Sequence, residues 1–388
     1  MMNVGTPRIY VDLLSFAKAM DILDGTTYNG GIENYFDIEG NKSDFDLIGL
    51  NPSNICQLKQ DSGGTDIDGT DRIIFHSKIN WNELLADNVF HAVLGHNFAS
   101  TQTNYFVESA SSWLANEDSG VNWENNAELG STISYDGFSL AYAQDGSSAS
   151  GKRVQFEIRD RSSGELYSAG YPNIGSLVFG NYYDFPHSPD LNLTMTIEND
   201  GITTQQTKGG ATLTNARYTG APKWGDLGCW ELQSSPPNYW NFNANLGARA
   251  GRRSWNLTFS YLSDKQTLPI NALGSAVANN EDGSNANGYI QDDLDDSTFE
   301  IPDWWWSDSV GGIFGAQYSP LNVLNGEDFF SSVWNKTMGG HLPFIFQPNK
   351  DNANPDQFAI CRFDMNSLQV KQVAYNTYTI SLKIRECW

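Results

Sequence analysis

The sequence predicts an all-β protein built mainly from antiparallel strands. Short runs in which apolar and polar residues alternate recur along the chain of 388 residues, and segments rich in glycine, asparagine, serine and threonine separate them. Alternation with a period of two is typical of a strand with one buried face, and regularly spaced turn residues are typical of a β-sandwich or jelly roll. Aromatic residues form 13% of the chain and provide large apolar side chains for its cores.

The clearest strand patterns lie in the second half of the chain. Apolar residues occupy every second position of two runs, at Trp255, Leu257, Phe259 and Tyr261 and at Tyr378, Ile380, Leu382 and Ile384. Each run predicts an antiparallel strand with one buried face. We expect these strands to pair in one sheet that also contains residues 342–346. The chain between them is then an insertion.

The N-terminal part reads as a loop-rich arm that we assign to residues 1–85. Residues 8–14 predict a short strand and residues 15–20 one or two helical turns, whereas residues 24–72 are rich in Gly, Asn and Asp. Four acids that could bind calcium lie close to glycine and hydroxyl residues, at Asp61, Asp66, Asp68 and Asp71. The ligand spacing and terminal glutamate of an EF-hand are missing, so we favour a solvated turn over a calcium site.

Residues 86–216 predict a β-sandwich domain. A mostly apolar run at 88–98 is compatible with a buried strand, and further strand patterns follow at 105–107, 138–142, 154–159, 174–180 and 191–197. Several short strands separated by turn residues are typical of a sandwich or jelly roll. We assign the discontinuous segments 217–262 and 327–388 to a second β-domain and residues 263–326 to its acidic insertion. A short amphipathic helix is predicted at 328–338.

Charge and cysteine usage exclude some classes of partner. The formal net charge is −23, so a nucleic-acid partner is not expected, because phosphate binding needs clustered Lys and Arg.

The N-terminal sequence does not resemble a secretory signal, and we expect no membrane-spanning helix and synthesis in a cytoplasm. Four widely spaced cysteines (Cys56, Cys229, Cys361 and Cys387) predict reduced thiols, although pairing of the last two stays open.

Two clusters are candidates for contacts between subunits. Arg249, Arg252 and Arg253 are concentrated in a chain with few basic residues, and they could clamp acidic neighbours or lie solvated in a turn. Trp304, Trp305 and Trp306 interrupt an acidic stretch, 281–308, that holds nine acidic and no basic residues. Adjacent side chains of a strand face opposite sides, so one sheet face cannot bury all three tryptophans. They could pack within the chain, contact a neighbouring subunit or stack on sugar rings.

No motif predicts catalysis or a cofactor. The sequence lacks the GxSxG, HExxH, GxxxxGK[ST] and GxGxxG patterns. His91 and His96 would face opposite sides of a strand, so we do not expect them to share a metal ion. Pairs of acids suitable for glycoside hydrolysis carry little information among 46 acidic residues. We therefore expect a protein without enzymatic activity, bound metal or cofactor.

Two stretches resemble proteins of tailed bacteriophages. Residues 92–97 and 174–180, with the alternating final strand, resemble the galactose-binding-type jelly rolls of phage tail proteins. The order of segments 253–259, 340–347 and 378–386 around a variable insertion is similar to the ring-forming β-domain of distal-tail and related minor tail proteins. The acidic insertion departs from the compact form of that domain, which leaves the position in the tail open.

The resemblance implies a virion structural protein. Several copies would form a ring or adaptor in the tail or baseplate, in contact with one another and with neighbouring tail proteins, after assembly in the host cytoplasm. The alternative is a carbohydrate-binding adhesin whose tryptophans hold a glycan of the host surface. The jelly roll by itself does not imply sugar binding, because such folds also serve as spacers.

Overall fold

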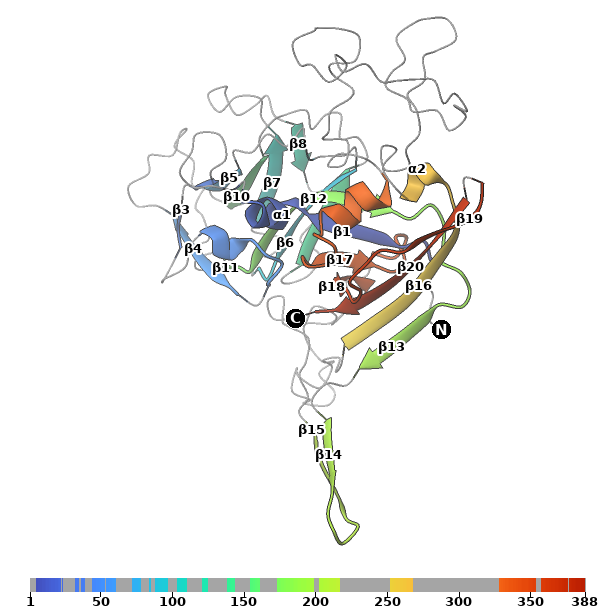
Figure 1. Ribbon diagram of the computed structural model, residues 1–388. Coiled ribbons are helices and arrows are strands. Elements are labelled where there is room, and N and C mark those ends of the chain that lie inside the picture. Colours follow the sequence, from blue (N-terminus) through green and yellow to red (C-terminus); the bar gives the residue numbers. More distant parts are fainter. Residues whose placement is uncertain are drawn as a thin grey trace, which may run out of the picture.

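The computed structural model confirms a mainly antiparallel β-protein (Figure 1). It describes residues 5–21, 23, 32–34, 36–38, 44–52, 54–60, 72–77, 84, 88–96, 103–109, 121–124, 138–143, 154–160, 173–198, 202–216, 252–267, 328–353, 357–375 and 377–387. The strands of these residues form a large sheet, a smaller second sheet, a three-stranded group and a separate hairpin.

The large sheet has ten strands and contains the main core. Its path runs β13-β16-β20-β18-β17-β1-β12-β6-β9, and β19 pairs with β20 off this path. In chain order the strands are β1 (Arg8–Asp12), β6 (Val89–Leu94), β9 (Phe138–Ala143), β12 (Ser176–Asp184), β13 (Thr194–Glu198), β16 (Arg252–Leu262), β17 (Phe344–Gln347), β18 (Ala359–Phe363), β19 (Val370–Ala374) and β20 (Thr377–Glu386).

The remaining strands lie in smaller groups. A five-stranded sheet has the order β2-β5-β10-β7-β8, a three-stranded group the order β11-β4-β3, and β14 pairs with β15. Their bounds are β2 (Ile32–Asn34), β3 (Phe36–Ile38), β4 (Cys56–Gln60), β5 (Arg72–Ser77), β7 (Thr103–Ser109), β8 (Val121–Glu124), β10 (Val154–Asp160), β11 (Asn173–Ile174), β14 (Ile202–Gln206) and β15 (Thr212–Ala216). The short helices are α1 (Leu13–Ala19), η1 (Asp44–Leu47), α2 (Asp264–Thr267) and η8 (Phe330–Asn335).

The expected pairing of the two strongest strand patterns is confirmed. β16 and β20 are antiparallel neighbours, with Leu257 opposite Leu382 and Phe259 opposite Ile380. These side chains are buried and belong to the main core. β17 lies in the same sheet, between β18 and β1. Only residues 263–267 of the expected insertion are described.

The central strand β1 comes from the N-terminal arm. It pairs with β12 on one side and β17 on the other, and all five of its residues are buried. A strand covered on both faces needs no polar face, which explains the run Ile9-Tyr10-Val11. The large sheet therefore joins strands from residues 1–85, 86–216, 217–262 and 327–388, and it crosses the boundaries drawn from the sequence.

Close packing holds α1 against this centre. A Cβ atom at Gly180 of β12 would lie 2.0 Å from the carbonyl oxygen of Val11, so only glycine allows the two strands to lie this close. The chain then enters α1, where the side chain of Asp12 accepts a hydrogen bond from the backbone N–H of Leu14. Asp12 thus serves as the N-cap, which satisfies a free donor of the first turn.

Three features differ from the sequence prediction in detail. The arm contains β2 to β5, strands of three to six residues that are too short to give a clear pattern. The β14–β15 hairpin was not predicted, although Gly209 and Gly210 between two Thr-rich runs are a hairpin signal. The helix expected at 328–338 is present as the π-helix η8, with Phe329 and Val333 buried. Cys56, Cys361 and Cys387 do not form disulfides with one another, and Cys229 lies outside the described residues.

Candidate functional site

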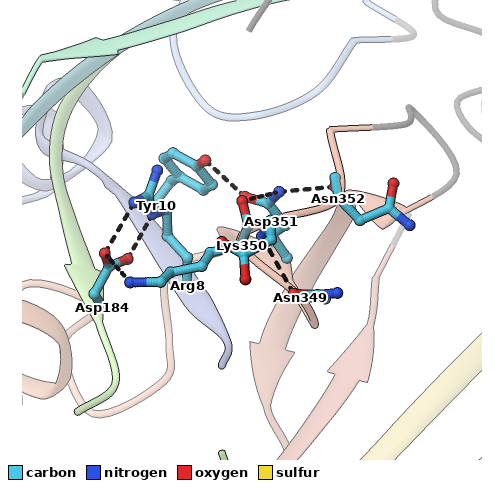
Figure 2. A network of polar contacts seen from close by, with 8 residues as sticks. Arg8, Tyr10, Asp184, Asn349, Lys350, Asp351 and Asn352 are labelled. Atoms are coloured by element: carbon cyan, nitrogen blue, oxygen red, sulfur yellow. Dashed lines mark hydrogen bonds and ion pairs between the residues drawn. The ribbon is translucent and has the colours of Figure 1, made fainter. Parts of the chain in front are cut away.

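The centre of the large sheet contains a buried charge network (Figure 2). Arg8 donates from Nε and Nη2 to the two carboxylate oxygens of Asp184, at 2.5 and 2.9 Å. The Arg8 guanidinium also lies 4.2 Å from the ring centroids of both Tyr142 and Tyr182, a double cation–π arrangement. Burial by itself would lower the pKa of Arg8, but the hydrogen bond to Asp184 and nearby negative charge outweigh it and raise that pKa. Arg8 is therefore a charged residue held by its own chain.

The same network fixes the turn after β17. Tyr10 donates its hydroxyl hydrogen to Oε1 of Gln347 at 2.8 Å, and Nε2 of Gln347 donates to the carbonyl oxygen of Asn352 at 2.9 Å. Lys350 in this turn places its Nζ 3.3 Å from Asp184 (Figure 2). Burial raises the pKa of Tyr10, so its hydroxyl stays a donor. These contacts join β1, β12 and β17 and describe a structural network.

Two further buried polar groups have shifted pKa values. Lys336 donates from Nζ to the carbonyl oxygen of Leu84 at 2.7 Å and to Oδ1 of Asn181 at 3.2 Å, and burial lowers its pKa to about 7. Nε2 of His96 lies 2.9 Å from Oγ of Ser139, and burial lowers the pKa of His96 to about 3. Lys336 and His96 have no exposed surface, so both are held by contacts within the chain.

The structure places Arg253, one of the three arginines of the expected inter-subunit cluster, in a buried ion pair. Its Nε donates to Oε1 of Glu386 of the same chain at 2.6 Å. The carboxylate of Glu386, which is also buried, accepts the backbone N–H of Arg253 as well. The strand register places the two residues opposite each other between β16 and β20, so the pair fastens these strands from within.

The other candidate residues have different outcomes. Arg252 is half-buried near Cys387. Burial raises the pKa of the Cys387 thiol, and the positive charges of Arg362 and Arg252 only partly oppose this rise. The remaining predicted positions lie outside the described residues: Arg249, Trp304, Trp305, Trp306, Asp61, Asp66, Asp68 and Asp71.

Within the described part of the chain, no group of three or more His, Cys, Asp or Glu residues could hold a metal ion. No helix in that part is long and apolar enough to cross a membrane.

One exposed region has the features of a binding surface. β13 ends the large sheet, and no strand among the described residues pairs with its outer edge. Leu191 before β13 is fully exposed and Ile197 within it is 52% exposed. Three residues further on, the β14–β15 hairpin projects from the body of the molecule (Figure 1). Residues 203–215 are all exposed, including Leu213. We call the outer side of β13 the exposed edge and keep the hairpin as a separate element.

A second group of exposed residues lies where β16 and β19 end and β20 begins. Tyr261 is 83% exposed and has a positive φ of 62° at the bulge where β16 shifts register against β20. Tyr375 in the β19–β20 turn and Val373 beside it are also exposed. A tyrosine in the left-handed region is strained, and such strain is concentrated at functional positions. Tyr261 of β16 and Val373 and Tyr375 at the end of β19 flank the start of β20, and we call these three residues the tyrosine patch.

Comparisons with known proteins add little to this geometry. The sequence matches no protein-family model and no curated protein. A solved structure of the CBM32-1, CBM32-2 and M60 catalytic domains of Clostridium perfringens ZmpB superposes with 9% identity and a TM-score of 0.21. The match covers 68% of this chain and 34% of that one, so the chain spans about a third of the length of its match. A likeness this weak carries no argument about function.

Proposed function

We propose that the chain is a structural subunit of a phage tail or baseplate, without catalytic activity, that associates with copies of itself and with neighbouring tail proteins. The observation that carries this proposal is the β14–β15 hairpin. A two-stranded hairpin in water is at best marginally stable, and this one exposes every residue from 203 to 215. Such an element gains stability when a partner covers it.

The distribution of charge supports assembly through this region. Copies of a chain with net charge −23 repel one another, so a self-contact is favoured where few acids lie. Residues 202–216 contain no acidic residue, and Lys208 is their single charge. The hairpin is therefore a segment with which one copy can approach another at little electrostatic cost.

The rigid body behind the hairpin also suits a structural role. One sheet includes strands from the beginning, middle and end of the chain, and the ion pairs Arg8–Asp184 and Arg253–Glu386 hold neighbouring strands together. The buried polar residues described above have partners within the chain. This arrangement suits a rigid structural subunit.

Particle composition and oligomeric state test the proposal. We expect analytical ultracentrifugation of the purified full chain to show concentration-dependent assembly into multimers. We also expect mass spectrometry of purified phage particles that encode the chain to find it in a fixed ratio to other tail proteins. A chain that stays monomeric at tens of micromolar and is absent from particles contradicts the proposal.

The tyrosine patch favours one alternative, a carbohydrate-binding adhesin. Exposed tyrosine rings can stack on sugar rings, and Tyr261 and Tyr375 lie at one end of the sheet near the hydroxyls of Ser260 and Thr379. A glycan array would distinguish the two functions. The adhesin predicts saturable binding that Tyr261→Ala removes, with Trp305→Ala testing the tryptophan cluster and Leu213→Ala as the control. The structural subunit predicts no specific glycan signal for any of these proteins.

A further inference from the structure

We infer that the β14–β15 hairpin of one copy adds to the outer edge of β13 in a second copy, so that the large sheet continues across the subunit boundary. This inference rests on the proposed self-association and adds to it the two surfaces that meet. It commits to one occupant for the edge, a second copy of this chain.

The first step is that β13 lacks the usual protection of an edge strand. It is five residues long and contains no proline, and its single charged residue, Glu198, is held by Arg385 through Oε2 at 2.6 and 3.0 Å. Natural edge strands are commonly blocked by free charges, prolines or bulges, because an open row of backbone N–H and C=O groups recruits another strand. In the described residues, β13 pairs only with β16.

The second step is the state of the side chains at this edge. Leu193 and Met195 are partly buried against the core, whereas Ile197 on the same side of the strand is 52% exposed. The apolar face of the sheet thus extends beyond the residues that cover it. An added strand with an apolar side chain would bury Ile197 and complete that face.

The third step is that the hairpin has the strand length and the exposed apolar side chain needed to extend the sheet at β13. β14 and β15 each have five residues, the length of β13. Threonine alternates in β15 as it does in β13, and Leu213 of β15 is 59% exposed on a hairpin with no core of its own. Backbone pairing would supply affinity and the contact between Leu213 and Ile197 would set the register, as in other cases of β-strand addition.

The fourth step concerns geometry. Hairpin and edge are different surfaces of the same chain, so their contact is head-to-tail, and such contacts produce rings when the rotation closes and filaments when it does not. Folding of the hairpin onto β13 of its own chain would be the competing arrangement, since only residues 199–201 separate them. In this structure β14 pairs with β15 and not with β13.

Complementation between two defective variants tests the inference. Ile197→Lys blocks the edge but leaves the hairpin intact, and deletion of residues 202–216 with a Gly-Ser linker leaves the edge intact. We expect each variant alone to associate about tenfold or more weakly than the natural chain, because interface substitutions at central contacts have effects of this size. An equimolar mixture should form 1:1 dimers that grow no further. Met20→Lys, at an apolar residue 50% exposed at the C-terminal end of α1, is the matched control and should assemble normally.

The outcomes separate this inference from the proposed function. If the natural chain assembles and the deletion variant assembles equally well, the inference is overturned but self-association stands. If the natural chain stays monomeric, both fail. A photo-crosslinker at position 213, in a mixture of 14N- and 15N-labelled chains, should give mixed-isotope peptides with β13. Crosslinks within single chains only would show that the hairpin folds onto its own edge and would overturn the inference. Unchanged thermal unfolding of each variant confirms that it is folded.

Discussion

The central strand β1 and the edge strand β13 have equal length and opposite surroundings. Each has five residues in the same sheet, but β1 is buried throughout, whereas Thr194, Thr196 and Ile197 of β13 are exposed. β1 also buries a charged residue, Arg8, whose guanidinium pairs with Asp184 and lies over the ring of Tyr142. The comparison shows that position in the sheet, and not strand length, decides which strands stabilise the molecule and which are available to a partner.

Charge pairs follow the same division. The pair Arg253–Glu386 lies between β16 and β20 with Glu386 inaccessible to solvent. Lys383 and Asp364 form a pair in which both side chains are more than two-fifths exposed, at 47% and 43%. Removing one partner of a buried pair leaves an uncompensated charge, whereas exposed pairs contribute little. The four predictions below test the contrast between interior and edge.

The largest effect is expected for Glu386→Gln. Its neutral amide leaves the Arg253 guanidinium buried without its counterion, so the free energy of unfolding should fall by about 3–5 kcal/mol. Urea unfolding followed by tryptophan fluorescence measures this. Asp364→Asn, in the exposed pair, is the control and should cost less than about 1 kcal/mol. Equal losses in the two variants would mean that burial does not set the strength of these pairs.

The next effect concerns apolar side chains on adjacent strands. Leu257→Ala on β16 removes a side chain that is 1% exposed and packs opposite Leu382, so it should lower the free energy of unfolding by about 2–5 kcal/mol. Ile197→Ala on β13 should cost less than about 1 kcal/mol in the monomer, because about half of the side chain is already in water. Both values come from urea unfolding at low protein concentration. A large loss for Ile197→Ala would show that the edge belongs to the core.

The third prediction uses pH to test the interior at Asp12. Burial raises the pKa of this carboxyl group to about 6, while hydrogen bonds from Ser15 and Leu14 oppose the rise. Between pH 4 and 6 the unfolded chain releases the proton and the folded chain keeps it, so stability falls as pH rises through this window. The fall should approach about 3 kcal/mol, from roughly 1.4 kcal/mol for each unit by which the pKa is raised.

Asp12→Asn keeps a helix N-cap but cannot titrate. The difference in unfolding free energy between the natural chain and this variant should therefore change between pH 4 and 6 and be constant above pH 7. Other titrating groups occur in both proteins, so they cancel in the difference. A difference that stays constant from pH 4 to 6 would contradict the raised pKa.

The smallest effect on stability is expected for the β14–β15 hairpin. Deleting residues 202–216 removes a hairpin that contributes no buried side chain in its described part, so the unfolding free energy of the monomer should change by less than about 0.5 kcal/mol. The control is the same deletion measured by sedimentation, where assembly should be lost. A clearly destabilised monomer would indicate that the hairpin packs on its own chain.

Local patterns predicted several parts of the fold because each depends on neighbouring residues alone. Alternation at Leu257 and Phe259 and at Ile380 and Leu382 correctly indicated two strands with one buried face, and their pairing is confirmed. The same alternation at 191–197 correctly indicated a strand but said nothing of its place at the edge of the sheet. A period of two reports which side chains share a face, and it does not report whether anything covers that face.

The residues of the candidate site were harder to predict from the sequence than the strands. Three nearby arginines suggested a surface clamp, but Glu386, 133 residues from Arg253 along the chain, draws that arginine into the interior. The hairpin at 202–216 was missed, although its glycine pair was a readable signal. The three alternatives for the tryptophan cluster stay open, and the solvated turn favoured over a calcium site at Asp61 to Asp71 stays a prediction, because those residues lie outside the described part of the chain.

The sequence by itself determined that this is an antiparallel β-protein with acidic character and that residues 252–262 and 377–386 are strands, because alternation and charge are local properties. Only the tertiary structure decided that the N-terminal strand fills the centre of a sheet whose other members come from the middle and end of the chain. It also decided that Arg253 is internal and that β13 ends the sheet formed by the described strands. Burial depends on partners distant in sequence, and a strand becomes a core element or a binding edge according to which of those partners is present.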